Sequence, residues 1–276
     1  RLFHATENGL APLDPARTKA AILHAMGGSL DAARERYAAP VLAMQHVVGV
    51  PSTCEQKTCA LSEQPWALKE KVGVVKLSSP LGVGAGMSET FRMQYAEGLP
   101  LDQVAFGQGR SAEEVSRLMA LRSAKYALSN HVPYIAQRGA SQLLGQILLA
   151  LQPTAAGSPP GTQWLAFVGH DTNIAQLRTL LGFDWKIAEY PENDAAPGGT
   201  LLFERWVDDH TGAQFVSVAY VAQSMDQLRS LSDAPPYQVQ YPGYAGKALM
   251  PLKGFVAEME KRIDPSATEV QHYLGQ

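Results

Sequence analysis

The stretch Trp164-Leu-Ala-Phe-Val-Gly-His-Asp-Thr-Asn173 decides the fold class. Its first five residues form a continuous apolar run, which is typical of a buried strand in a parallel sheet. A helical pattern follows at once and reaches Leu181, where Gly182 ends it. A strand that leads directly into a helix is a building unit of α/β sheets. We therefore predict an α/β region around this stretch.

A second sheet signal lies further along the chain. Residues 200–207 and 214–221 are rich in β-branched and aromatic side chains, and they flank the turn sequence Asp208-Asp-His-Thr-Gly-Ala213. Two such runs around a polar, glycine-containing turn predict a β-hairpin. Combined with the strand and helix before it, the hairpin indicates an α/β sheet region.

The first half of the chain is predicted to be mostly helical, from residue 15 to residue 130. Pro15 opens a helix over residues 16–26, and glycines follow it, which is the usual asymmetry of helix ends. A second helical pattern covers residues 29–48, and Pro40 should bend or split it.

Two serines predict further helix starts. Ser88 has the place of an N-cap for a helix over residues 89–97, and the glycine-rich stretch 82–86 before it is expected to be a flexible loop. That stretch is not a dinucleotide motif, because Met87 stands where the third glycine would be. Ser111 and Glu114 have the spacing of a capping box.

Composition limits the classes of function. The 276 residues are 46% hydrophobic and 18% charged, which describes a folded chain with a core. The net charge of −3 gives no basic field, so no nucleic-acid partner is predicted. No apolar run is long enough to predict a membrane span. No metal-ligand motif is found, so neither a metal nor another cofactor is predicted.

Polar residues gather where the predicted strand 164–168 meets its helix. In α/β sheets this place binds ligands, and the helix N-terminus favours anions. There His170 could hold an oxyanion, and the like charge of a bound anion would raise the pKa of Asp171, which could then act as a general acid. The alternative is structural: Asp171 or Thr172 caps the helix, and His170 is only a neighbour.

The two cysteines, Cys54 and Cys59, share a short polar loop. A metal site is not indicated, because no second Cys or His pair at ligand spacing follows. The thiols are therefore either bridged, which implies an oxidising compartment and about 2 kcal/mol of stabilisation, or free and reduced.

Three segments carry a family resemblance. Residues 167–173 resemble the His-Asp signature of histidine acid phosphatases, in the form found in bacterial periplasmic phytases and glucose-1-phosphatases. Pro197-Gly-Gly-Thr-Leu-Leu-Phe-Glu-Arg-Trp206 is similar to a strand of the same proteins, and residues 132–138 resemble their return from helical domain to sheet. The resemblance covers nearly the whole chain.

The resemblance implies a fold and a division into domains. The fold would be α/β, with part of a mixed sheet flanked by helices like that of phosphoglycerate mutase and histidine phosphatases, and with an inserted α-helical domain. Residues 1–12 and 131–276 would form an incomplete α/β phosphatase domain, and residues 13–130 an α-helical cap domain. The cysteine pair falls where the family carries a short disulfide, which implies a Cys54–Cys59 bridge and a periplasmic or secreted protein.

The resemblance also implies roles for single residues. Asp171 would donate a proton to the leaving alkoxide, His170 would contact the phosphoryl group, and Thr172 would orient the substrate or the loop. Glu89 and Arg138 match positions that line the substrate pocket. For these two a structural alternative stays open, because Glu89 fits a first-turn carboxylate and Arg138 a surface ion pair.

The sequence departs from the family at the nucleophile. The family uses the histidine of an RHGxRxP motif with its arginines, and no Arg-His-Gly occurs among the 276 residues. His4 is not a substitute, since its surroundings resemble the family's chain after that motif. The start at Arg1 is therefore interpreted as a cut end, and the chain alone is expected to be inactive, with the missing N-terminal segment as its partner.

The expected activity of the complete protein is hydrolysis of a small phosphomonoester, phytate or a sugar phosphate, through a phosphohistidine. One alternative is a non-catalytic protein that binds phosphate or a sugar phosphate and keeps the fold. Another is an α/β hydrolase with His170 as base. It would need a nucleophile elbow, which the sequence does not show.

Overall fold

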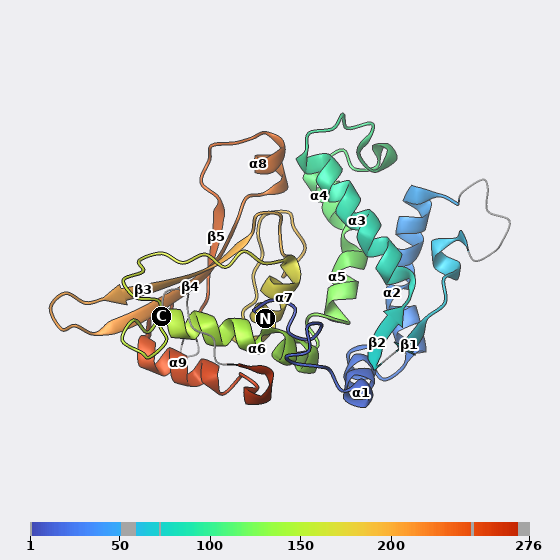
Figure 1. Ribbon diagram of the computed structural model, residues 1–276. Helices are drawn as coiled ribbons and strands as arrows, with labels where there is room; N and C mark the ends of the chain where they lie inside the picture. The colour runs from blue at the N-terminus through green and yellow to red at the C-terminus, as the bar shows by residue number, and fades with distance from the viewer. Residues whose placement is uncertain (1, 51–58, 72, 244–245, 270–276) are drawn as a thin grey trace.

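The computed structural model describes residues 2–50, 59–71, 73–243 and 246–269. Figure 1 shows helices α1 to α5 grouped apart from strands β3 to β5, which lie with α6, α7 and α9. Within the described ranges, no helix is long and apolar enough to cross a bilayer. In chain order the elements are α1 (Pro15–Ala25), α2 (Leu30–Val48), η2 (Leu61–Glu63), β1 (Ala67–Lys71), β2 (Val74–Ser78), α3 (Pro80–Ala96), η3 (Val104–Gly107), α4 (Ala112–Leu118), α5 (Ala120–Ala127), α6 (Pro133–Ala150), α7 (Asp171–Leu181), β3 (Thr200–Val207), β4 (Gln214–Ala222), α8 (Met225–Arg229), β5 (Tyr237–Gln240), β6 (Met250–Pro251), α9 (Leu252–Glu260) and η4 (Pro265–Ala267).

The first two helices form where the sequence predicts them. The side chain of Asp14 accepts a hydrogen bond from the Arg17 amide and so caps α1, which begins at Pro15. The side chain of Ser29 does the same for α2. Pro40 lies inside α2, and the helix continues through it to Val48.

Helix α3 begins earlier than predicted, at Pro80, and Ser88 lies in its interior. The Ser88 hydroxyl is buried and lies 2.9 Å from the carbonyl oxygen of Gly84 and 2.6 Å from that of Leu118. A Cβ atom at Gly84 would collide with the side chain of Leu121, so the glycine allows α3 to pack closely on α5. The predictions of an N-cap at Ser88 and a loop at residues 82–86 were therefore wrong.

The largely helical first half also contains a hairpin that the sequence did not indicate. Strands β1 and β2 pair antiparallel, from Ala67 opposite Ser78 to Lys71 opposite Val74. Leu68, Val75 and Leu77 are partly buried against the hydrophobic core. These apolar side chains hold the hairpin against the helices beside it.

The predicted hairpin in the second half is confirmed. Strands β3 and β4 are antiparallel, with Thr200 opposite Val221 and Val207 opposite Gln214. Strand β4 also pairs with β5 and with β6, which gives a four-stranded sheet. With helices α6, α7 and α9 beside this sheet, the α/β class predicted from the sequence is confirmed (Figure 1).

The apolar run at residues 164–168 is not a strand in the described structure. It joins no ladder among the described residues, and Trp164 and Val168 are 80% and 86% exposed. A strand requires a neighbour for its backbone groups, and no described segment supplies one here. Helix α7 still begins directly after the run and ends at Gly182, whose φ of 61° gives the left-handed cap that the glycine predicts.

An aromatic cluster fixes the loop that follows α7. The ring of Trp185 stacks on that of Tyr220 in β4, with ring centroids 4.0 Å apart. The Trp185 indole donates a hydrogen bond to the carbonyl oxygen of Asp194, and the Ala196 amide donates to the Tyr220 hydroxyl. The loop is thereby attached to the sheet, and the side chain of Asp194 is held toward α3 and α5.

Candidate active site

Two helices present arginines toward the start of α7. On α3, Glu89 and Arg92 are three residues apart and therefore lie on one face, where they form an ion pair. On α5, Arg122 and Tyr126 are four residues apart, and the guanidinium carbon of Arg122 lies 4.4 Å from the centre of the Tyr126 ring. Close packing of α3 on α5 brings these two faces together.

Asp194 joins the two arginines. One carboxylate oxygen accepts a hydrogen bond from Arg122 at 2.6 Å and the other from Arg92 at 2.7 Å. The three side chains are 1%, 4% and 2% exposed, respectively. Complete burial raises the pKa of Asp194, and the two guanidinium charges oppose that rise. A buried ionic cluster of this kind is stable only when each charged group is paired with one of opposite charge.

Asp171 is the first residue of α7, and its carboxylate reaches the same arginine. One oxygen accepts from Arg122 at 2.7 Å and the other from the Thr172 amide at 2.7 Å. Burial raises the pKa of Asp171, but the hydrogen bond from Tyr126 and the charge of Arg122 outweigh it and hold that pKa below its ordinary value. Without a bound anion, Asp171 is therefore ionised. The raised pKa of Asp171 that the sequence predicts applies to the site with an anion bound.

Residues at the start of the chain reach His170. The rings of His4 and His170 meet edge to face with centroids 5.1 Å apart. His170 itself is exposed, and its amide donates to the side chain of Asn173 at 2.9 Å. A Cβ at residue 169 would lie within 3 Å of both Asn173 and Phe3, so Gly169 allows this close approach. The histidine is thus oriented at the exposed N-terminus of α7.

The structure brings four of the predicted site residues together. Asp171 and Glu89 both bind Arg122, and Thr172 contacts Tyr126 through its hydroxyl. His170 is the neighbour of Asp171 in the chain and occupies the N-cap position of α7. The candidate site therefore lies where α3, α5 and α7 meet.

Arg138 lies apart from that cluster, on α6. Its guanidinium donates to the carboxylate of Asp264 at 2.9 Å, to the Ser266 hydroxyl at 2.6 Å and to the carbonyl oxygen of Pro12 at 3.2 Å. These contacts connect α6 to both ends of the described chain. They favour the ion-pair interpretation of this residue over pocket lining.

Replacing Arg138 with alanine should lower the free energy of unfolding by about 1–3 kcal/mol, because three hydrogen bonds of a charged group are lost. Affinity for a polyanionic ligand should not change. Urea denaturation and titration calorimetry measure the two effects. Arg117→Ala is the matched control, since that side chain is 72% exposed and should change neither quantity. A large loss of affinity at unchanged stability would instead place Arg138 in the binding site.

A groove of about 410 Å³ runs along α3 beside this cluster. It begins at Glu89 and reaches Leu99 past a second carboxylate, Glu97. Its lining is mostly apolar, with Met93 and Leu99 beside the two carboxylates, and it contains no cation that would favour a phosphate group.

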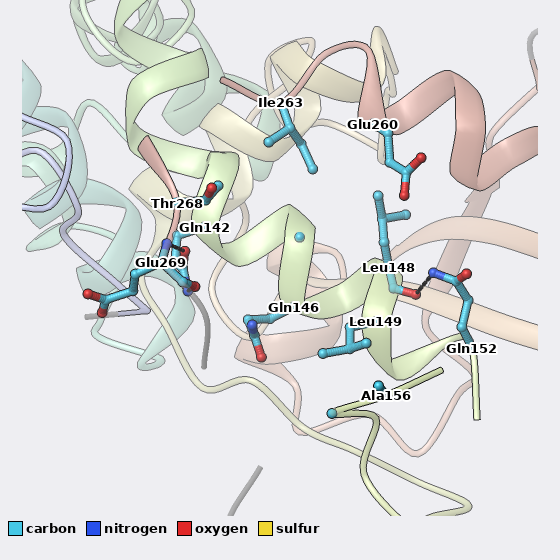
Figure 2. Close-up of a pocket in the computed structure, with 12 residues that line it drawn as sticks. Gln142, Gln146, Leu148, Leu149, Gln152, Ala156, Glu260, Ile263, Thr268 and Glu269 are labelled. Carbon is cyan, nitrogen blue, oxygen red and sulfur yellow. Dashed lines mark hydrogen bonds between the residues drawn. The ribbon is translucent and has the colours of Figure 1, made fainter. Parts of the chain in front are cut away.

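A second pocket, of about 350 Å³, lies between α6 and the last described segment (Figure 2). The Gln142 side chain pairs there with both backbone groups of Glu269. The two charged residues that line it, Glu260 and Glu269, are acidic. Because none of its lining residues is cationic, this pocket is a poor site for a phosphate ester.

Among the described residues, no group of three or more His, Cys, Asp or Glu side chains is arranged to hold a metal ion. Cys54 lies outside the described residues, so its predicted pairing with Cys59 stays a prediction.

Comparison with known proteins places this geometry in a family. The model of the histidine phosphatase superfamily, branch 2, matches residues 92–221, a range that contains Arg122, Asp171 and Asp194. The solved phytase of Klebsiella sp. ASR1 is 32% identical, with a TM-score of 0.83 over 98% of this chain and 68% of that one. The chain belongs to the histidine phosphatase superfamily. This confirms both the family and the fold class expected from the His-Asp signature.

Other members of the superfamily match at similar levels. Phytase AppA of Escherichia coli strain K12 is 29% identical over 256 residues, which are 87% of this chain and 59% of that protein. A glucose-1-phosphatase of Providencia rettgeri is 32% identical over 168 residues, 59% of this chain and 40% of its own. The Hafnia alvei phytase in complex with myo-inositol hexakis sulphate has a TM-score of 0.84 at 28% identity. The chain thus spans about three fifths or less of these two curated relatives.

Sequence reasoning did not find the residues that organise this histidine phosphatase site. Arg92, Arg122, Tyr126 and Asp194 were not among the candidates. One signal existed for the first, because an arginine one turn after Glu89 shares its helix face. A second was available on α5, where Arg122 and Tyr126 are four residues apart and therefore also share a helix face. No local signal marks Asp194, which lies in a loop.

Proposed function

We propose that this chain is part of a phosphomonoester hydrolase of the acid phosphatase or phytase type. The observation that carries the proposal is Asp171 at the N-terminus of α7, next to exposed His170 and bound to Arg122. In a histidine phosphatase, Asp171 would be the general acid and His170 would contact the phosphoryl group. Arg122 would be the cation that positions Asp171.

The reaction has two balanced steps. A histidine nitrogen attacks phosphorus, the ester P–O bond breaks, and Asp171 gives its proton to the departing alkoxide. Water then attacks the phosphorus of the phosphohistidine, the P–N bond breaks and frees the histidine, one water proton passes to Asp171, and inorganic phosphate leaves. His170 contacts the phosphoryl oxygens in both steps, and Thr172 holds the loop through Tyr126. The attacking histidine belongs to a segment outside these 276 residues, since no Arg-His-Gly occurs within them.

The substrate is a small phosphomonoester, phytate or a sugar phosphate. The Hafnia alvei phytase was solved with myo-inositol hexakis sulphate, which is a polyanion, and with tartrate, which is a hydroxyl-bearing acid. In this chain the groove along α3 begins at Glu89 and would receive the alcohol part of the substrate. For a sugar phosphate, the carboxylates of the groove would accept hydrogen bonds from ring hydroxyls, which phytate does not have.

The test uses the longer polypeptide encoded with this chain. Incubation with radiolabelled substrate and an alkaline quench should trap an acid-labile phosphoenzyme, because phosphohistidine survives base but not acid. The 276-residue chain alone should form none. A longer protein that hydrolyses the ester without a trapped phosphoenzyme would contradict the histidine route.

A non-catalytic protein that binds phosphate or a sugar phosphate is the second candidate. The observation that favours it is the absence of an RHGxRxP motif from these residues. Calorimetric binding of inositol hexakissulphate by the longer protein, without release of phosphate from any monoester, would support this candidate over the hydrolase.

The remaining proposals concern location and domain division. We propose a periplasmic or secreted protein with a Cys54–Cys59 disulfide, and mass spectrometry with and without reductant tests the bridge.

We also propose that residues 13–130 form a cap over the α/β part built by residues 1–12 and 131–276. Limited proteolysis should then cleave near these boundaries first.

A further inference from the structure

Five charged side chains from four segments meet around one guanidinium. Arg122 binds Asp171, Glu89 and Asp194 at 2.7, 2.8 and 2.6 Å, using a different nitrogen for each. Arg92 completes the cluster through its bonds to Glu89 and Asp194. Every nitrogen of Arg122 is therefore engaged by a carboxylate, and no other described side chain contacts all three acids.

Charge and exposure divide this cluster into two parts. Three carboxyl groups face two guanidinium groups, so the cluster carries one surplus negative charge when all are ionised. Asp194 lies at the buried end, where both of its oxygens accept hydrogen bonds from arginines. Glu89 and Asp171 lie at the open end, 39% and 43% exposed. Glu89 and Asp171 are therefore the two carboxylates of the cluster that a bound anion can approach.

We propose that Arg122 is the positioning residue of this site. Arg122 holds Asp171 ionised and oriented until an anion binds beside Asp171. The inference rests on the proposed function, because it concerns the acid of that reaction. Without a ligand, Arg122 satisfies the carboxylate. A phosphate dianion beside Asp171 adds a like charge, so Asp171 takes up a proton when there is a phosphoryl group to use it.

The groups that face Asp171 agree with this role. Arg122 and Tyr126 approach it from α5, and Arg92 acts on it from α3. The Thr172 amide is its neighbour on α7. Each of these favours the ionised carboxyl, while burial and the negative charges of Glu89 and Asp194 oppose it. Arg122 is the cation in direct contact with the carboxylate, so the balance depends on it.

The experiment follows the Asp171 carboxyl by carbon-13 NMR in the 276-residue chain labelled at aspartate side chains, with Asp171→Asn for assignment. In the wild type the Asp171 midpoint should lie below the ordinary value of about 3.9. In the double variant Arg122→Gln with Asp194→Asn, which removes one charge of each sign, it should rise by about one pH unit or more. Arg122→Lys is the milder variant and should give a smaller rise.

Controls separate the proposal from a loss of structure and from the proposed function. The midpoint of Asp264, paired with Arg138, should stay constant in every folded variant. An unchanged Asp171 midpoint in a folded Arg122 variant overturns the inference. Inositol hexakissulphate should raise the wild-type midpoint, and binding seen by calorimetry without that rise also overturns it. Absence of binding even by a longer protein that carries the proposed nucleophile segment counts against the proposed function instead, and the comparison of Arg122 variants still decides the inference.

Discussion

Replacing Asp194 with alanine should lower the free energy of unfolding by about 3–5 kcal/mol, because it leaves two buried arginines without their shared counter-ion. The guanidinium groups of Arg92 and Arg122 are almost fully buried, and the loop that carries Asp194 holds them between α3, α5 and the sheet. Loss of the carboxylate therefore affects the packing of three segments. Urea denaturation followed by circular dichroism measures the change.

Asp184→Ala is the matched control on the same loop. Asp184 also pairs with an arginine, Arg178, but its side chain is 64% exposed. Water and salt screen such a pair, and its loss should lower stability by less than about 1 kcal/mol. Equal effects of the two substitutions would show that the buried cluster contributes no more than a surface ion pair.

The parts of the fold that were predicted correctly depend on short-range contacts. Helix α1 is determined by its own cap residues at Asp14 and Pro15. The β3–β4 hairpin is determined by two runs rich in β-branched and aromatic residues around one turn, and the end of α7 by Gly182. In each case the residues that decide the structure lie within a few positions of one another, so a pattern in the sequence contains them all.

The incorrect predictions depend on partners far along the chain. By local rules, the glycines at 82–86 predict a loop. The stretch is instead helical, and Gly84 packs against Leu121 of α5. The run at 164–168 has the composition of a buried strand, yet among described residues it has no strand beside it. The composition of a segment determines which secondary structure it prefers, but whether it pairs as a strand depends on a neighbouring strand supplied by the rest of the fold.

The candidate site shows the same division. His170, Asp171 and Thr172 were found because they are adjacent in the sequence, and Glu89 because of a family resemblance. Arg122 was missed because its partner Asp171 is 49 positions away, and Asp194 because it is 102 positions from Arg92. Contacts over such distances arise from the packing of α3, α5 and the loop after α7, which no local pattern describes.

In a longer polypeptide that supplies the proposed nucleophile, Asp171→Asn should slow hydrolysis of alkyl phosphates by about 10²–10⁴-fold. An alkoxide is a poor leaving group and requires the proton that Asp171 supplies. For p-nitrophenyl phosphate the loss should be far smaller, because nitrophenolate leaves without a proton. Steady-state rates on both substrates, measured at acidic pH, give the ratio that tests the acid role.

The pH dependence of this reaction follows from the same residue. Since Arg122 and Tyr126 lower the pKa of Asp171 in the free protein, the protonated acid is lost as pH rises through that low value, and kcat/KM should decline toward neutral pH. Asp171→Asn removes the titrating group, so this decline should disappear from its residual activity on alkyl phosphates. Asp184→Asn is the control and should keep the wild-type profile. Equal losses on alkyl and aryl substrates, with the decline retained, would mean that another group donates the proton and that Asp171 acts through Arg122 alone.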